Sequence, residues 1–134
     1  MTGVQTCALP IFYSNEFQIT AQYLRWTLLG DYLKVASWIL SVPLLAAGDM
    51  RGFLLADVAA YSTFITSSAV LSRWLPVAEA AACGFLFMYT MHLLVCGVLA
   101  SSRHGIRISL GTGLTWLTGL AGLAAVSAFS WEFQ

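Results

Sequence analysis

The chain has 134 residues, of which 59% are hydrophobic and 9% charged, and its six basic and six acidic side chains leave no net charge at pH 7. A soluble domain usually has about 25% charged residues, and a chain this short cannot bury so many apolar side chains within itself. The composition therefore excludes an ordinary water-soluble domain, and the lack of a basic cluster excludes nucleic acid as a partner.

The first eleven residues, Met1 to Ile11, read MTGVQTCALPI and resemble the translation of a sequencing-library adapter. They contain no Lys or Arg and no apolar core of the length that a secretory signal peptide has. We therefore expect residues 1–11 not to be native protein. We expect residues 12–134 to be a membrane domain fragment, from the C-terminal part of a longer chain whose N-terminal part is missing.

Four segments have the length and composition of membrane-spanning helices, which need about 20 mostly apolar residues. Glycines and charges separate the first two segments, Pro76 precedes the third, and a basic stretch precedes the fourth. Because the connections are short, neighbouring helices must run antiparallel. The sequence predicts an all-α integral membrane bundle of four antiparallel transmembrane helices, at 23–47, 53–71, 77–100 and 108–129.

The distribution of basic residues predicts the orientation of this bundle. The first and third loops hold Arg51, Arg103 and Arg107, whereas the opposite side holds Arg73. Loops rich in Lys and Arg remain in the cytoplasm. We therefore expect the first and third loops to be cytoplasmic.

Three charged residues within the first predicted helix, Arg25, Asp31 and Lys34, are its most unusual feature. Each costs on the order of 3 kcal/mol in the middle of a bilayer. Asp31 and Lys34 are three residues apart, so they share a face and can pair. One interpretation is a structural ion pair, with Arg25 reaching to the membrane interface. The other is a water-filled cavity in which Arg25 and Lys34 bind an anionic head group.

Three further residues have a structural and a functional interpretation. Asp57 is an interfacial acid or a partner of Arg51, or else a proton-coupling group. His92 has no carboxylate or cysteine beside it in this interpretation, and we expect a packed, hydrogen-bonded histidine. Pro43 removes a backbone hydrogen bond and predicts a bend late in the first helix.

The second and fourth predicted helices are rich in small and hydroxyl-bearing residues. In the second helix the hydroxyls fit backbone hydrogen bonds, a packed interface or a sugar-facing wall. In the fourth, glycines predict a surface suited to close helix contact. These glycines are Gly111, Gly113, Gly119 and Gly122.

The sequence contains none of the common catalytic motifs, such as GxSxG, HExxH or a Walker loop. Cys7, Cys83 and Cys96 are odd in number and lack metal-ligand spacing. We therefore expect no enzyme activity, no cofactor and no metal site. The remaining possibilities are a conduit or a scaffold.

The stretch from Phe12 to Val58 resembles the late C-terminal-lobe region of the O-antigen flippases, in the multidrug/oligosaccharidyl-lipid/polysaccharide exporter superfamily. The motifs that carry the resemblance are Tyr13-Ser14 with Glu16-Phe17, Leu24-Arg25-Trp26, the run from Leu29 to Val35, Ser37-Trp38, and Leu44-Leu45-Ala46. A weaker similarity continues from Phe85 to Ser109. The third segment departs from the superfamily because it begins with Leu75, Pro76 and Glu79 rather than a glycine-rich stretch.

The resemblance implies that the first three helices are the tenth to twelfth of a two-lobe flippase in the bacterial inner membrane. Such proteins move an undecaprenyl-pyrophosphate-linked oligosaccharide across the membrane by alternating access, which implies this lipid-linked oligosaccharide and membrane lipids as partners. It also implies that Arg25 and Lys34 bind substrate, with Asp31 as their intrahelical partner. The alternatives are a multidrug exporter of the same architecture and a small four-helix membrane scaffold protein.

Overall fold

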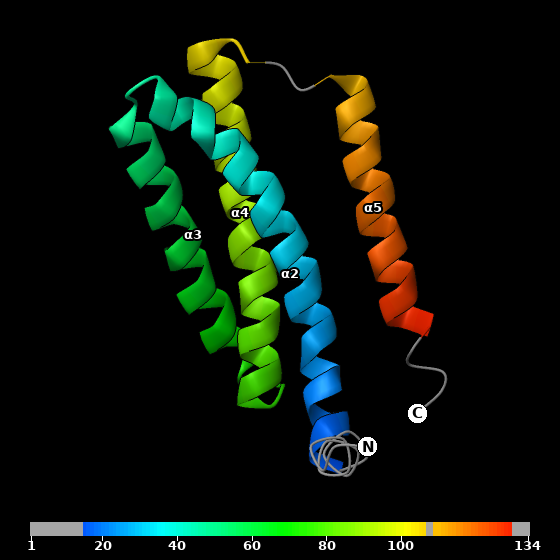
Figure 1. Cartoon of the computed structure of the whole chain (residues 1–134). Coiled ribbons are helices and arrows are strands. Elements are labelled where there is room, and N and C mark those ends of the chain that lie inside the picture. Colours follow the sequence, from blue (N-terminus) through cyan, green and yellow to red (C-terminus); the bar gives the residue numbers. More distant parts are fainter. Residues whose placement is uncertain (1–14, 107–108, 130–134) are drawn as a thin grey trace, which may run out of the picture.

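The computed structural model describes the backbone of residues 15–106 and 109–129, and the side chains of 23–106 and 109–127. The predicted adapter segment, 1–11, lies outside the described residues. Figure 1 shows the helices of the described part running alternately up and down, as the short loops predicted. They are α2 (Asn15–Ala46), α3 (Met50–Leu71), α4 (Val77–His104) and α5 (Leu110–Phe129).

All four helices contain a stretch long and apolar enough to cross a membrane. The predicted number of spans is confirmed, but several boundaries differ. Helix α2 begins at Asn15 rather than 23, α3 begins at Met50 rather than 53, and α4 continues to His104 rather than ending at 100. The end of α2 and the start of α5 each differ by one or two residues. Hydropathy detects the apolar part of a helix, whereas its ends are decided by capping of free backbone groups. Asp49 accepts a hydrogen bond from the Gly52 amide at the start of α3. Gly105, at a φ of 64°, ends α4 in the left-handed conformation.

The bend expected from Pro43 is present. Pro43 lies inside α2 and has no N–H to donate to the carbonyl of Ile39. In Figure 1 the last part of α2 (cyan to teal) leans over towards α3.

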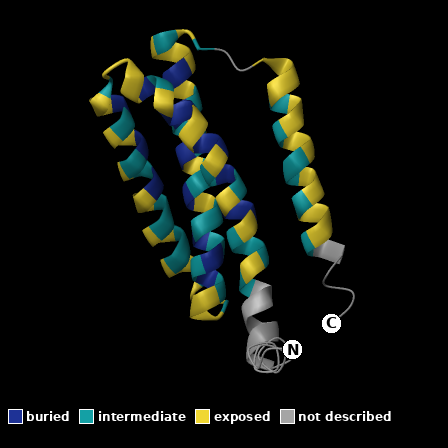
Figure 2. Ribbon diagram, viewed as in Figure 1, coloured by how far each residue is buried: buried dark blue, intermediate teal, exposed yellow. Residues whose placement is uncertain are grey.

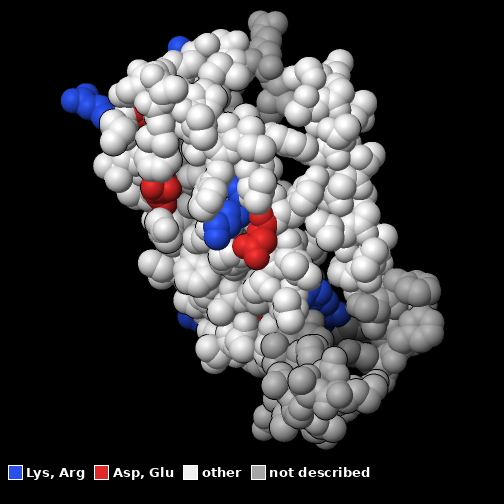
Figure 3. Space-filling view, viewed as in Figure 1, with Lys and Arg blue, Asp and Glu red and all other residues white. Residues whose placement is uncertain are grey.

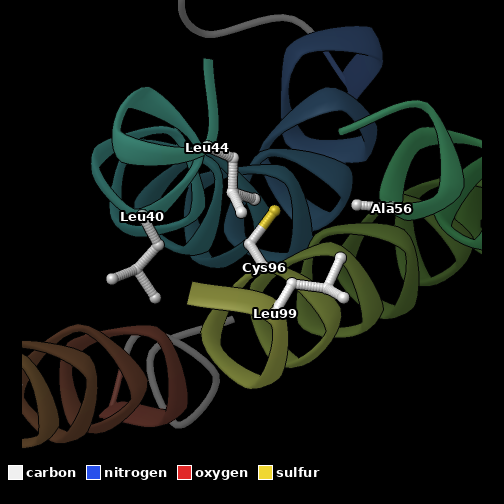
Figure 4. Packing of buried hydrophobic residues seen from close by; sticks show 5 residues of the cluster. All are labelled: Leu40, Leu44, Ala56, Cys96 and Leu99. Atoms are coloured by element: carbon white, nitrogen blue, oxygen red, sulfur yellow. The ribbon is translucent and has the colours of Figure 1, made fainter. Parts of the chain in front are cut away.

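The core lies where α2 and α3 pack against α4. Figure 4 shows side chains from these three helices meeting there, with the Cys96 thiol of α4 beside Leu44 of α2. Buried positions on the three helices face one another in Figure 2. The core cluster consists of Leu40, Leu44, Ala56, Cys96 and Leu99.

Helix α5 lies at the side of this three-helix core, with Trp116 packed against the core cluster. Its spanning stretch, Leu110–Ser127, contains no fully buried residue, and Figure 2 shows it exposed or half-buried along its length. It contacts α2 where the Tyr32 hydroxyl donates to the Trp116 carbonyl at 3.0 Å and packs against Gly119. At Gly113 and Gly122 an added Cβ would meet nothing within 4 Å. Among the described residues, close contact at the glycines of this helix is therefore found at Gly119 and not at Gly113 or Gly122.

Candidate functional site

The predicted pair on α2 is present. The Lys34 Nζ lies 3.9 Å from an Asp31 carboxylate oxygen, and the Lys34 side chain is 31% exposed. The same ammonium lies over two aromatic rings, 5.2 Å from the centre of Trp38 and 5.6 Å from that of Tyr89. A cation over the face of an aromatic ring is attracted by the ring quadrupole. Lys34 is therefore held between one carboxylate and two rings. Figure 3 shows how few charged groups interrupt this face of the molecule.

A second polar pair joins α3 to α4. The His92 Nε2 lies 3.3 Å from an Asp57 carboxylate oxygen, and the imidazole is almost fully buried. The Cys96 thiol lies 3.7 Å from the same Nε2. The expected packed histidine is confirmed, but the expectation that it has no carboxylate or cysteine beside it was wrong.

The proposed pairing of Asp57 with Arg51 was also wrong. Six positions along one helix correspond to a rotation of about 240°, so the side chains of Arg51 and Asp57 lie on different faces of α3. His92 instead faces Asp57 from the neighbouring helix. The His92–Cys96 contact follows the four-residue spacing that places side chains on one helical face, so the sequence contained that signal. The Asp57–His92 pair had no such signal, because it depends on the register between α3 and α4.

These groups line or adjoin a cavity of about 420 Å³ between α2, α3 and α4, which we call the aromatic groove. Specific ligand pockets usually measure about 300 to 1,000 Å³ and place a few polar groups in an apolar wall. The groove has this character, because the aromatic rings of Trp38, Phe53, Tyr61 and Tyr89 and several aliphatic side chains surround its polar groups. Its aromatic and polar lining consists of Trp38, Ser41, Phe53, Asp57, Tyr61, Tyr89 and His92.

Arg25 lies elsewhere. It contributes to a smaller hollow of about 290 Å³ between α2 and α5, and its guanidinium lies 5.7 Å from the centre of the Trp26 ring. Lys34 follows Arg25 by nine positions on the same helix. The two side chains therefore start from opposite sides of α2, half a turn apart and about 13 Å apart along the helix axis. The structure therefore brings Lys34 and Asp31 together beside the aromatic groove and directs Arg25 to another side of α2.

A charged cluster that the sequence interpretation missed lies at the end of the bundle. Arg103 Nη1 donates to both carboxylate oxygens of Asp49, at 3.0 and 3.3 Å, and His104 Nε2 lies 3.4 Å from one of them. The hydrogen bonds from the Gly52 amide and from Arg103 hold the pKa of Asp49 below its ordinary value. The cluster joins the first loop to the end of α4. The first and third predicted loops, which hold Arg51 and Arg103, therefore do lie at one end of the bundle.

The described residues contain no group of three or more His, Cys, Asp or Glu side chains that could hold a metal ion. The expectation of no metal site stays a prediction for the whole chain.

Two curated proteins are similar to part of the chain. The chain is 28% identical over 95 residues, 68% of its length, to the Lipid III flippase of Escherichia coli (strain K12), and equally so to that of Shigella flexneri. It spans 22% of the length of these relatives. No family model and no solved structure matches the chain. Both relatives are named as flippases of Lipid III, and neither name refers to an O-antigen unit.

Proposed function

We propose that this chain is part of a flippase that moves an undecaprenyl-pyrophosphate-linked glycan from the cytoplasmic to the periplasmic face of the bacterial inner membrane. The observation that carries the proposal is the 95-residue similarity to the Lipid III flippases. The four apolar helices support it. We propose the O-antigen unit as the cargo, because residues 12–58 resemble the O-antigen flippases. The role is transport by alternating access, without catalysis and without a cofactor.

Lys34 is the residue that we propose meets the pyrophosphate. A cation in a low-dielectric site stabilises an anionic head group that would otherwise be costly to move through the bilayer. The Lys34 ammonium lies 3.9 Å from the nearer Asp31 carboxylate oxygen, which is beyond hydrogen-bond distance. An ammonium has three donors. A phosphate oxygen can therefore be bound by Lys34 while Asp31 still balances its charge.

Arg25 has a different place in the proposal. Because it lies on another side of α2, next to α5, one pyrophosphate cannot touch Arg25 and Lys34 together. We propose that Arg25 meets the head group at a separate stage of the path. Asp31 remains the partner of Lys34, and Asp57 contributes to the wall of the aromatic groove.

The test uses the full-length protein that contains this segment, in cells that depend on it for surface glycan. We expect Lys34→Ala and Arg25→Ala to lower surface glycan at least about tenfold at normal expression, a loss of ~1.4 kcal/mol or more in transport. Arg73→Ala is the matched control, because Arg73 lies in the turn between α3 and α4. Normal glycan in both variants would remove these cations from the substrate role. Loss of drug resistance with unchanged glycan would support a multidrug exporter instead.

A further inference from the structure

We propose that the aromatic groove binds one neutral sugar ring, and that this ring is the first saccharide of the transported glycan. The identity of the saccharide as part of a lipid-linked glycan rests on the proposed function. The chemistry of the ligand does not, because it is read from the residues of the groove.

The aromatic rings give the first argument. Trp38 and Tyr61 are 57% and 60% exposed, so large parts of both side chains are free to contact a ligand. Tyr89 closes the groove from α4, and its ring is held edge-to-face by Phe85, with the centroids 4.8 Å apart. Aromatic rings offer flat apolar faces at a low entropic cost, and Tyr adds a hydroxyl that can donate or accept. The C–H face of a sugar ring suits such faces.

The charges around the groove disfavour a cation at the rings and an anion beside Asp57. Lys34 already lies over Trp38 and Tyr89, so a second cation at these rings would meet a like charge. An anion bound deeper in the groove would meet the carboxylate of Asp57. A neutral ligand avoids both costs, and this distinguishes the groove from a cage for organic cations, which also uses aromatic rings.

The polar groups supply partners for hydroxyls. Asp57 is 36% exposed at its side chain and is bound by His92 through one of its oxygens, at 3.3 Å. A carboxylate has about four acceptor positions, so it can still accept hydrogen bonds from a sugar, and such charge-assisted bonds are strong. The Ser41 hydroxyl donates to the Trp38 carbonyl and remains an acceptor. A volume of about 420 Å³ is within the range of pockets that hold small polar molecules.

The place of the groove agrees with a path for lipid-linked glycan. Its lining includes Leu45, near the end of α2, and Phe53, in the first turn of α3. The groove therefore extends to the end of the bundle that the basic loops predict to be cytoplasmic. Lys34 lies further along α2, away from that end, so a sugar in the groove and a phosphate at Lys34 would be neighbours.

The experiment measures saturation-transfer NMR of N-acetylglucosamine with the full chain in nanodiscs of phosphatidylethanolamine and phosphatidylglycerol. We expect a signal from N-acetylglucosamine and none from choline. Trp38→Leu is expected to weaken binding about fivefold, which is ~1 kcal/mol for a lost aromatic contact. Trp74→Leu is the matched control, because Trp74 lies in the α3–α4 turn, 75% exposed and away from the groove, and we expect unchanged binding.

A second variant guards against loss of folding. Asp57→Asn keeps the shape of the side chain and removes its charge, and we expect weaker N-acetylglucosamine binding with an unchanged helical circular dichroism spectrum. The inference is overturned by no sugar signal, by choline binding in its place, or by equal weakening in Trp38→Leu and Trp74→Leu. Sugar binding without a transport defect in Lys34→Ala would retain the groove and reject the role of Lys34. Loss of export in Lys34→Ala, together with no sugar signal, would support the role of Lys34 and reject the groove.

Discussion

Individual side chains in this bundle compensate charges that the membrane would otherwise penalise. Lys34 has Asp31 and two aromatic rings, and Asp57 has His92. Removing one partner of such a pair leaves a charge without compensation, which is more costly than replacing both partners. The pairs are therefore expected to be sensitive to single substitutions.

Asp49 provides a pH-dependent test at this scale. Because its pKa is lowered from 3.8, its contacts stabilise the folded chain above pH 3.8 and are lost as the pH falls through the lower folded-state value. We expect the thermal unfolding midpoint of the native chain to fall on acidification below pH 4, and the midpoint of Asp49→Asn to fall less. Thermal scans in nanodiscs at pH 7 and at pH 3 would measure this.

Asp49→Ala completes the comparison. Asn can still accept the Gly52 amide as a helix cap, whereas Ala cannot. At pH 7 we therefore expect the midpoint of Asp49→Ala to lie below that of Asp49→Asn. Parallel pH curves for the native chain and Asp49→Asn would contradict the assignment of this acid sensitivity to the contacts of Asp49 with Arg103 and His104.

The helices differ in how closely they approach one another. Gly30 lets α2 come close to α4, since an added Cβ would lie 2.5 Å from a ring carbon of Phe85. Helix association in membranes depends on such small residues because lipid is as apolar as the side chains. Helix α5 lacks comparable contacts along most of its length within the described chain. The close packing therefore unites α2, α3 and α4, whereas α5 packs more loosely, mainly near Trp116 and Gly119.

Gly30→Ala tests the approach of α2 to α4. We expect a destabilisation of about 1 to 3 kcal/mol, the usual range for overpacking, together with weaker sugar binding because Phe85 supports Tyr89. The measurement is the thermal unfolding midpoint in nanodiscs. Gly122→Ala is the matched control, since an added Cβ there meets nothing within 4 Å, and equal effects of the two substitutions would refute the close contact.

At the scale of the whole molecule, the contacts of Asp49 with Arg103 and His104 fix which loops share an end. The turn between α2 and α3 and the end of α4 lie together, and the turn between α3 and α4 lies at the other end (Figure 1). The groove and Lys34 lie between these ends. The direction of the bundle in the membrane stays a prediction from the basic residues.

Cysteine labelling tests this direction. In a Cys7→Ser background, we expect a membrane-impermeant maleimide to label Ala47→Cys and Ser102→Cys only in inverted membrane vesicles. We expect it to label Ser72→Cys only from the outside of intact cells. All three native residues are exposed, so reactivity reports the side of the membrane. Labelling of positions 47 and 102 from opposite sides would contradict the fold, and labelling of both from outside would contradict the orientation.

The sequence by itself determined the fold class, the number of spans and the Asp31–Lys34 pair. These depend on the length of apolar segments and on spacing along one helix, which are local properties. The separation of Arg25 from Lys34 likewise follows from spacing along one helix. The tertiary structure decided the pairing of Asp57 with His92 and the aromatic groove. Each depends on how the helices are rotated and shifted against one another, and close packing of side chains from different helices fixes that register.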